Sequence, residues 1–417
     1  MHKTKKYLLG LLAILIVFTN TPISVATQAE AEPVSLEEIA PRTESLLVAN
    51  PETEEIYYSK NPELVVPVAS ISKLMTYVVV KDAIAAGTIA LTDKVVIDKD
   101  AAALNIPGYS RMELKVGEEL SVEDLLAGLM IVSANDAAVA LAKHVAGTEE
   151  DFVIMMNDKA KNLNLNSSAF INASGITNRV ILEDDETEGI EYNQMSALEL
   201  LTLTKYLVNT YPEVEAYGEM KQLVMPERDF IGEHTHSMYD RIKGLKGLKT
   251  GYTEEALFNF VGYVDMNEYS PGQDYRLITV VTGAHTDGVR RRATEALINY
   301  VDQNYHYSDL LGFDNQYPIV DYQSNNTEPQ TFPLYLESPL RGVFPVTMQT
   351  DIRYELDYDK QAPYEDGEVL GKVIVHYRGE DVGQVNLINK GYKPKLGFFA
   401  QIYESLKELI KSIMIIF

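Results

Sequence analysis

Two serines precede a lysine in the stretch V-A-S-I-S-K-L-M-T, which covers residues 68–76. A serine hydroxyl becomes an effective nucleophile only when a neighbouring base removes its proton, and lysine can be that base if burial or a nearby cation lowers its pKa. Residues three apart share one face of a helix, whereas adjacent residues diverge by about 100°. Ser70 and Lys73 are therefore the candidate nucleophile and base, and Ser72 is expected to point elsewhere.

Two further short motifs could serve such a serine. The triplet S-A-N at residues 133–135 lies between two helical patterns, and K-T-G at residues 249–251 lies in a predicted strand within G-L-K-T-G-Y-T. Each motif alone is common in proteins. In this order the three form the S-x-x-K, S-D-N and K-T-G set of penicillin-recognising serine enzymes, with Ala in the middle of the second element.

The chain resembles the D-alanyl-D-alanine carboxypeptidases, the low-molecular-mass penicillin-binding proteins. The resemblance rests on P-V-A-S-I-S-K-L-M-T, S-A-N-D-A-A, A-F-I-N-A-S-G-I and G-L-K-T-G-Y-T, and it extends over nearly the whole chain. It implies a serine-type enzyme that removes the terminal D-alanine from peptidoglycan stem pentapeptides through an acyl-enzyme. It also implies that penicillins and other β-lactam antibiotics acylate the protein.

The resemblance assigns a role to each catalytic residue. Ser70 attacks the carbonyl of the penultimate D-alanine and forms the acyl-enzyme, while Lys73 accepts the hydroxyl proton. Ser133 relays a proton to the leaving amine. The reaction implied in this way uses no cofactor and no metal ion.

The second and third motifs supply the implied substrate-binding residues. Asn135 holds the peptide amide, Lys249 provides positive potential, and Thr250 contacts the terminal carboxylate. The oxyanion hole combines the backbone N–H of the nucleophile with that of Tyr252, and Gly251 belongs to the same substrate-binding strand. Preorganised donors of this kind lower a reaction barrier by about 3–4 kcal/mol each.

Two positions depart from the pattern of the family. Many relatives have His after K-T-G, whereas this chain has Tyr252; because the contact there is a backbone N–H, we expect catalysis to be spared. Some relatives carry N-R-N about fifteen residues before K-T-G, where the arginine helps to hold the substrate carboxylate. This chain has H-T-H at residues 234–236. Recognition of the carboxylate is therefore expected to depend more on Thr250 and Lys249.

Two other polar groups have less specific interpretations. His234 and His236 raise the question of a metal site, but the chain has no cysteine and no H-E-x-x-H motif. We therefore expect loop histidines without a metal. The run of arginines at residues 290–292 opens a helical pattern and is expected to form a solvated face.

The order of the predicted elements indicates the fold. Strand patterns at residues 45–50 and 56–59 and again at 257–264 and 276–282 enclose a mainly helical region, which predicts one sheet built from distant parts of the chain. Together with the resemblance, this predicts an α/β (α+β) penicillin-binding and β-lactamase-like catalytic domain over residues 35–310, with a mainly antiparallel sheet. Short β-rich runs then predict a small all-β, sandwich-like domain over residues 315–390.

The two ends of the chain indicate export and membrane attachment. Residues 1–29 have the basic, apolar and small-residue regions of a signal peptide. Residues 393–417 form an amphipathic helical pattern that is too polar to span a bilayer, so we expect this helix to lie on the outer face of the cytoplasmic membrane. The net charge of −25 argues against nucleic acid as a partner. The predicted location is the cell-wall space.

Three alternative functions remain open at this point. A D,D-transpeptidase would use the same residues, because acyl transfer to an amine needs the same nucleophile and base. A class A β-lactamase would need a glutamate roughly thirty residues after the S-x-N element, but residues 161–182 contain neither Asp nor Glu. A non-catalytic wall-binding scaffold would not need the three motifs intact.

Overall fold

The computed structural model describes most of the chain after the predicted signal peptide. The described residues are 35–181, 188–236, 238, 240–310, 319–324, 331–346, 351–360, 364–377, 379–392, 402–403 and 405–406. The predicted signal peptide (1–29) lies outside them, as does most of the predicted tail helix (393–417). Within the described residues, no helix is both long enough and apolar enough to cross a membrane.

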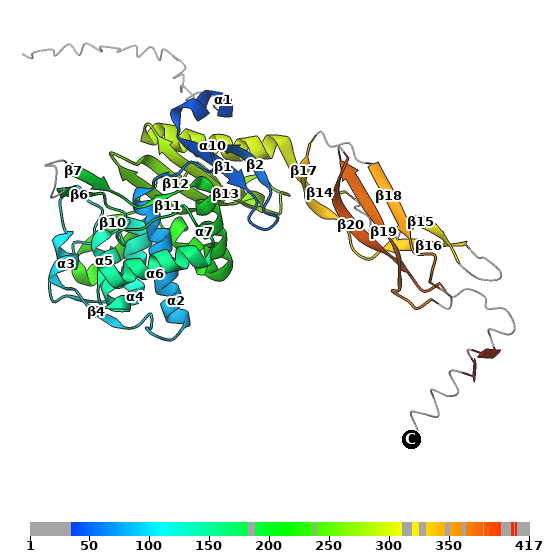
Figure 1. Cartoon of the computed structure of the whole chain (residues 1–417), viewed down its shortest axis with the longest axis horizontal. Helices are drawn as coiled ribbons and strands as arrows, with labels where there is room; N and C mark the ends of the chain where they lie inside the picture. Colours follow the sequence, from blue (N-terminus) through cyan, green and yellow to red (C-terminus); the bar gives the residue numbers. More distant parts are fainter. Residues whose placement is uncertain are drawn as a thin grey trace, which may run out of the picture. The chain divides into compact units, whose positions relative to one another are not determined.

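A five-stranded antiparallel sheet forms the centre of the N-terminal region (Figure 1). Its strand order is β11-β12-β13-β1-β2, so the first two strands of the chain pair with strands from more than 200 residues later, for example Leu47 with Val280. The strands are β1 (Ser45–Ala49), β2 (Ile56–Lys60), β11 (Leu245–Thr253), β12 (Leu257–Asp265) and β13 (Arg276–Ala284). The predicted sheet from distant parts of the chain is confirmed.

Helices cover both faces of this sheet. Successive side chains of a strand point to opposite sides, so the residues of β1 pack alternately into two cores. Leu47 and Ala49 of β1 pack into the core shared with the central helices. Leu46 and Val48 pack into a second core with helix α10 (Asp287–Asn304) and the short helix α1 (Leu36–Ile39). The whole of β1 is consequently buried, as expected for a strand between two helical layers.

Helix α2 (Lys73–Ala85) is the central helix of the first core, and nine of its 13 residues are buried. It packs with α5 (Asn135–Ala146), α6 (Glu149–Asn162) and α7 (Ala197–Thr210). Helix α4 (Val122–Ala127) begins at a capping box formed by Ser121 and Asp124. It continues into a π-helical turn (Gly128–Val132), which ends at Ser133 with a left-handed φ of 63°.

Shorter elements connect these layers. They are η1 (Ala40–Arg42), β3 (Val66–Pro67), η2 (Ala69–Ser72), β4 (Lys94–Val96), α3 (Lys99–Ala103), β5 (Glu119–Ser121), β6 (Asn178–Ile181), β7 (Glu188–Glu191), β8 (Gln194–Met195), η4 (Pro212–Val214), α8 (Glu215–Glu219), β9 (Gln222–Met225), η5 (Pro226–Arg228), β10 (Phe230–Glu233) and α9 (Met266–Tyr269). Of these, η2 matters most for function, because it carries both serines of the first motif.

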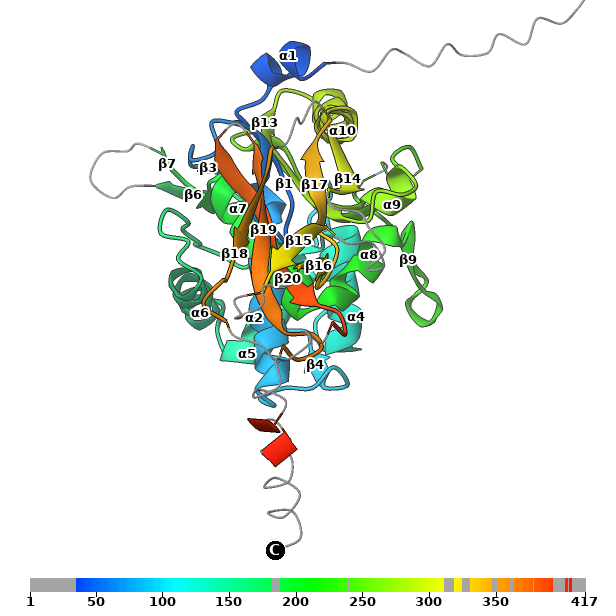
Figure 2. The same ribbon diagram turned by 90° about the vertical axis from the view of Figure 1, so that its right-hand side faces the viewer.

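The C-terminal region is built from strands (Figure 2), and its five-stranded sheet has a core of its own. Five strands pair in the order β15-β16-β20-β19-β18, and β14 pairs separately with β17. The strands are β14 (Tyr305–Asp309), β15 (Val320–Gln323), β16 (Thr331–Leu336), β17 (Arg341–Pro345), β18 (Asp351–Leu356), β19 (Val369–Tyr377) and β20 (Glu380–Asn389). Since residues 311–318 are not described, the predicted start of this domain at residue 315 stays a prediction.

The central sheet yields a test of stability. Leu47 is fully buried, whereas Ile231 in β10 is 64% exposed. Leu47→Ala is expected to lower the free energy of unfolding by about 2–5 kcal/mol, because it removes buried methyl groups and leaves a cavity. Ile231→Ala is the control and should change it by about 0.5 kcal/mol or less. Denaturant unfolding followed by circular dichroism measures both, and equal losses would contradict the assignment of Leu47 to the core.

Candidate active site

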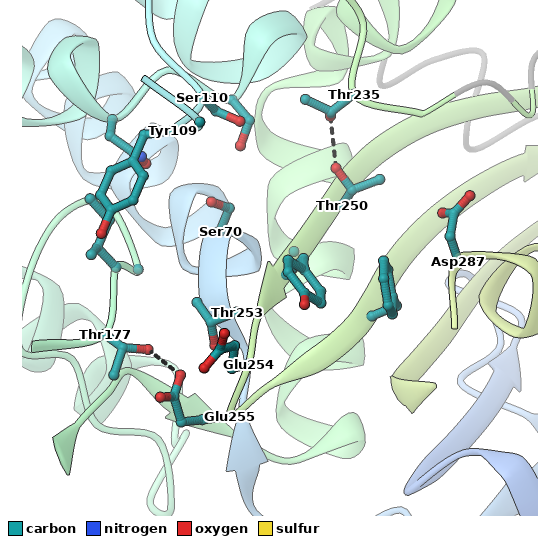
Figure 3. A pocket seen from close by; sticks show the side chains of 18 of the residues that line it. Ser70, Tyr109, Ser110, Thr177, Thr235, Thr250, Thr253, Glu254, Glu255 and Asp287 are labelled. Atoms are coloured by element: carbon teal, nitrogen blue, oxygen red, sulfur yellow. Dashed lines mark hydrogen bonds between the residues drawn. The ribbon is translucent and has the colours of Figure 1, made fainter. Parts of the chain in front are cut away.

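The three motifs of the sequence meet in one cleft of about 650 Å³. Ser70, Ser133, Asn135, Thr250 and Tyr252 all line it. The lining comes from the nucleophile turn, the turn before α5, and the edge strand β11. Figure 3 shows the Ser70 side chain among these walls, with Thr250 and Thr235 pointing toward each other beside it.

The structure separates the two serines of the first motif. The Ser70 hydroxyl oxygen lies 2.9 Å from Nζ of Lys73. Ser72 is buried, and its hydroxyl donates to the backbone oxygen of Ala69 at 2.6 Å. Ala69 itself has a φ of 49°, a conformation that costs a non-glycine residue about 1–3 kcal/mol and is often found at functional sites. Ser72 therefore stabilises the turn, whereas Ser70 faces the base.

Lys73 is fully buried, and its amine has three neutral hydrogen-bond partners. Besides the Ser70 hydroxyl, these are Oδ1 of Asn135 at 2.7 Å and the backbone oxygen of Ser174. Burial, reinforced by the charge of Lys249, holds the pKa of Lys73 well below its ordinary value, while Asp136 partly opposes this. A neutral amine can direct two N–H groups at Asn135 and Ser174, so that its lone pair faces the Ser70 hydroxyl. This arrangement can remove a proton from Ser70.

The contact with Ser174 was not expected from the sequence, although A-F-I-N-A-S-G-I contributed to the resemblance. The hydroxyl of Thr76, one turn along α2, donates to the backbone oxygen of Ala173 at 2.7 Å. Gly175 follows with a φ of 78°, and a Cβ there would lie 2.1 Å from the backbone oxygen of Ala69. A side chain would not fit at this contact, so residue 175 must be glycine. This glycine is the feature of the sequence that could have located the loop beside Ser70.

Lys249 and Thr250 form the positive end of the cleft. Lys249 is fully buried, and its burial, with a contribution from Arg290, lowers its pKa to about 7. The Thr250 hydroxyl lies 2.7 Å from the hydroxyl of Thr235, the middle residue of the H-T-H segment. A hydroxyl pair beside buried cations can bind a carboxylate.

Arg290 corrects the expectation of a solvated arginine face. It is only 6% exposed and lines the cleft, with its guanidinium paired to Asp287 and 6.0 Å from the ring centre of Phe258. Its neighbour Arg292 is exposed, as expected. On α10, Arg290 shares a face with the buried residues Ala293 and Thr294, because residues three and four apart lie together. That periodicity was present in the sequence.

The two histidines beside Thr235 lie in a loop, as predicted, and both are buried. Burial lowers the pKa of His234 to about 3 and that of His236 to about 4, so both rings are neutral at physiological pH. The ring centres are 4.2 Å apart. His234 Nδ1 accepts from the backbone N–H of His236, and His236 Nδ1 accepts from that of Met238. In the described part of the chain, no group of three His, Asp or Glu residues could hold a metal ion.

Strand β11 brings Gly251 and Tyr252 to the nucleophile. A Cβ at Gly251 would lie 2.5 Å from the backbone oxygen of Val68, so only glycine lets the strand approach the turn this closely. Tyr252 is 54% exposed, and its ring centre lies 4.4 Å from that of Phe258. Because β11 is the edge of the sheet, its outer side can pair with an extended peptide.

Ser133 and Asn135 are held by the unusual backbone between α4 and α5. Ser133 is nearly buried and left-handed, and Asn135 begins α5 while its backbone N–H donates to the backbone oxygen of Ser110 at 2.9 Å. Six of the eight predicted site residues thus line one cleft, whereas the fully buried Lys73 and Lys249 do not. Arrangements of this kind suit acyl transfer through a covalent intermediate.

Comparison with known proteins places this cleft in a family. The family described as D-alanyl-D-alanine carboxypeptidase matches residues 27–286. The D-alanyl-D-alanine carboxypeptidase DacF of Bacillus subtilis (strain 168) is 26% identical over 412 residues, which are 98% of this chain and 99% of that protein. Penicillin-binding protein 5 from Haemophilus influenzae has a TM-score of 0.61 and 26% identity, covering 84% of this chain and 97% of that chain.

A further solved structure adds a ligand. Penicillin-binding protein D2 from Listeria monocytogenes, in its ampicillin-bound form, has a TM-score of 0.52 and 28% identity. The match covers 62% of this chain and 96% of that one. The predicted penicillin-binding type of fold is confirmed by these likenesses. The chain belongs to the D-alanyl-D-alanine carboxypeptidase family.

Proposed function

We propose that this cleft removes the terminal D-alanine from peptidoglycan stem pentapeptides, with Ser70 as nucleophile and Lys73 as general base. Membership of the family makes the protein a serine-type D-Ala-D-Ala carboxypeptidase, which is a hydrolase. The observation that carries the residue assignment is the buried amine of Lys73, 2.9 Å from the Ser70 hydroxyl and depressed in pKa.

Acylation then proceeds as follows. The Lys73 amine takes the Ser70 proton as Oγ attacks the carbonyl of the penultimate D-alanine, and the negative charge on that oxygen is stabilised by the backbone N–H groups of Ser70 and Tyr252. Ser133 relays the proton from Lys73 to the departing amine as the amide bond breaks, so that D-alanine leaves and Lys73 is neutral again. Water attacks the resulting ester in the second half; Lys73 accepts the proton of this water and returns it to Ser70 Oγ as the ester bond breaks. β-Lactams enter the same cycle through their strained amide.

The substrate carboxylate is expected at the positive end of the cleft. Thr250 supplies a hydroxyl there, while Lys249 and Arg290 supply charge. Arg290 provides the guanidinium that the H-T-H segment lacks. Since the protein carries a net charge of −25, this local positive potential is the feature that draws an anionic group into the cleft.

The alternative functions are less well supported. Residues 161–182 contain no Asp or Glu that could act as the deacylating base of a class A β-lactamase. A non-catalytic scaffold would not need a lysine amine buried beside a serine. Transpeptidation uses the same groups and differs only in the acceptor, which is an amine instead of water. The ratio of hydrolysis to transfer is measured by assaying both products.

The two serines of the first motif give a direct test. Ser70→Ala is expected to abolish labelling by a fluorescent penicillin and release of D-alanine, because it removes the nucleophile. Ser72→Ala should retain labelling and lose only the buried hydrogen bond to Ala69, worth about 1 kcal/mol of stability. Gel fluorescence and a D-alanine assay measure both variants. Loss of covalent labelling in folded Ser72→Ala alone would show that the assignment is wrong.

The positive end of the cleft predicts selective loss with carboxylate substrates. Lys249→Ala and Arg290→Ala should each lower kcat/KM for a D-Ala-D-Ala tripeptide by about tenfold or more, because a hydrogen bond to a charged group is worth about 1.5–3 kcal/mol. The C-terminal amide of the same peptide should lose much less. Arg292→Ala, an exposed neighbour on α10, is the matched control. Equal losses on acid and amide would exclude a carboxylate-binding role.

We further propose that the mature protein is exported and lies on the outer face of the membrane. Support comes from the signal-peptide pattern of residues 1–29 and from the tail, where four lysines stand against two glutamates in residues 393–417. The described tail residues Ile402, Tyr403 and Leu406 are helical, and their apolar side chains are exposed. An interfacial helix with an apolar stripe binds membranes through buried area and attraction to anionic lipids.

We therefore expect residues 393–417 to determine whether the enzyme is found in the membrane fraction or in the soluble fraction. Deletion of residues 393–417 should release a soluble enzyme that still hydrolyses small D-Ala-D-Ala peptides at a near-normal rate. A full-length chain with Ile402→Glu and Leu406→Glu keeps the length but interrupts the apolar stripe, and it should also leave the membrane fraction. Membrane flotation and a D-alanine assay are the measurements. Tight membrane association of the truncated chain, once removal of the signal peptide is verified, would refute the anchor.

A further inference from the structure

We propose that Asp136 is a positioning residue for this reaction, which rests on the function proposed above. Its buried carboxylate joins the loop at residues 108–114 to the turn that carries Ser133 and Asn135, so that two walls of the cleft keep one arrangement. None of the three motifs includes this residue, although it follows S-A-N directly.

The carboxylate is fully buried and accepts only from backbone amides. Oδ1 accepts from Met112 N–H at 3.0 Å and from Ala137 N–H at 2.9 Å, and Oδ2 accepts from Met112 N–H at 3.0 Å and from Leu114 N–H at 3.1 Å. Burial raises the pKa of Asp136, and these amides oppose that effect. Because both oxygens face N–H donors, the bound form is the carboxylate.

The amides of Met112 and Leu114 belong to a loop that forms part of the cleft. Gly108, Tyr109 and Ser110 line it, and Figure 3 shows Tyr109 and Ser110 on the wall near Ser70. Apart from turns, residues 105–118 have no regular secondary structure, so no strand pairing holds residues 108–114 in place. Instead, the Asp136 carboxylate accepts from the loop amides of Met112 and Leu114. The backbone oxygen of Ser110 in the same loop accepts from the N–H of Asn135.

The loop is also fixed from its other side, which leaves it little freedom to adjust. Arg228 donates to the backbone oxygen of Met112 at 3.1 Å, and the Met112 side chain packs on Gly128, where a Cβ would lie 1.9 Å from Sδ. Asp136 is therefore the link between a rigid loop and α5. Asn135, one residue before it, accepts from Lys73 at 2.7 Å. A displacement of Asp136 would therefore also displace Asn135, which holds the amine of Lys73.

The charge of Asp136 acts on the base as well. The charged groups that face Lys73 are Lys249 from β11 and Asp136 from α5, while its three hydrogen-bond partners are neutral. Asp136 raises the pKa of Lys73 against burial and against Lys249. Removal of this negative charge should therefore lower the pKa of Lys73 and move the acid limb of the rate profile to lower pH. A purely structural residue would not move that limb.

Three variants separate position from charge. Asp136→Asn keeps the shape, but its amide nitrogen would face N–H donors at either oxygen position and the negative charge is lost. Asp136→Glu keeps the charge and moves the carboxylate by one methylene. Asp98→Asn is the matched control, because Asp98 also accepts from two backbone amides, those of Asp100 and Ala101, but lies at the start of α3 outside the cleft lining.

The experiment measures acylation by a fluorescent penicillin and kcat/KM for a D-Ala-D-Ala tripeptide across pH, with thermal unfolding to verify folding. Asp136→Asn is expected to lose roughly 10- to 100-fold in rate, the size of loss that displaced catalytic groups produce, and its acid limb should move to lower pH. Asp136→Glu should lose rate while its acid limb stays in place. Asp98→Asn should keep both the rate and the limb of the unmodified protein.

A folded Asp136→Asn with the normal rate, or with a reduced rate and an unmoved acid limb, would overturn the proposal. If that variant does not fold, hydrogen exchange in the unmodified protein still decides. The amides of Met112 and Leu114 should exchange slowly although they lie outside helices and sheets, because a buried carboxylate holds them. Fast exchange at both would overturn the proposal. Failure of the proposed function itself would appear separately, as absence of turnover in the unmodified protein.

Discussion

The arrangement of the cleft depends on one lysine amine that is held inside the protein, where burial lowers its pKa. A buried ammonium is costly unless it is paired, so a lysine surrounded by neutral acceptors gives up its proton. Lys73 meets a hydroxyl, a side-chain amide oxygen and a peptide carbonyl, from Ser70, Asn135 and Ser174. Each of the three partners comes from a different part of the chain. The base is therefore made by the fold, and the S-x-x-K spacing alone would not make one.

The other buried cations, Lys249 and Arg290, make one end of the cleft positive. Lys249 raises the cost of a charge on Lys73, and Arg290 does the same to Lys249, so the charges disfavour one another along the site. Such a set of cations is unfavourable when the cleft is empty of anions. A ligand with a carboxylate at the Thr250 end relieves that repulsion, whereas a neutral ligand does not. In the reaction proposed above, recognition of a free C-terminal carboxylate and activation of Ser70 thus have one electrostatic origin.

Much of this arrangement could be read from the sequence. The spacing of Ser70 and Lys73 predicted that these two side chains meet, and the strand patterns at both ends of the catalytic region predicted the sheet in which β1 pairs with β13. Arg290 was misjudged, because three adjacent arginines suggested a surface although position 290 lies on the buried stripe of α10. The contact of Lys73 with Ser174 could not be predicted, since it joins residues 101 positions apart through a backbone atom that any residue possesses.

Close approach of backbones explains how these distant groups are held so accurately. The nucleophile turn lies between two glycines, Gly175 and Gly251, whose absent Cβ atoms would meet the backbone oxygens of Ala69 and Val68. Packed on both sides in this way, the turn keeps Ala69 in a left-handed conformation that an isolated peptide would leave. The surrounding buried core stabilises that strain. Preorganisation follows, because Ser70 is already placed against its base before a substrate arrives, and little reorganisation remains for the reaction itself.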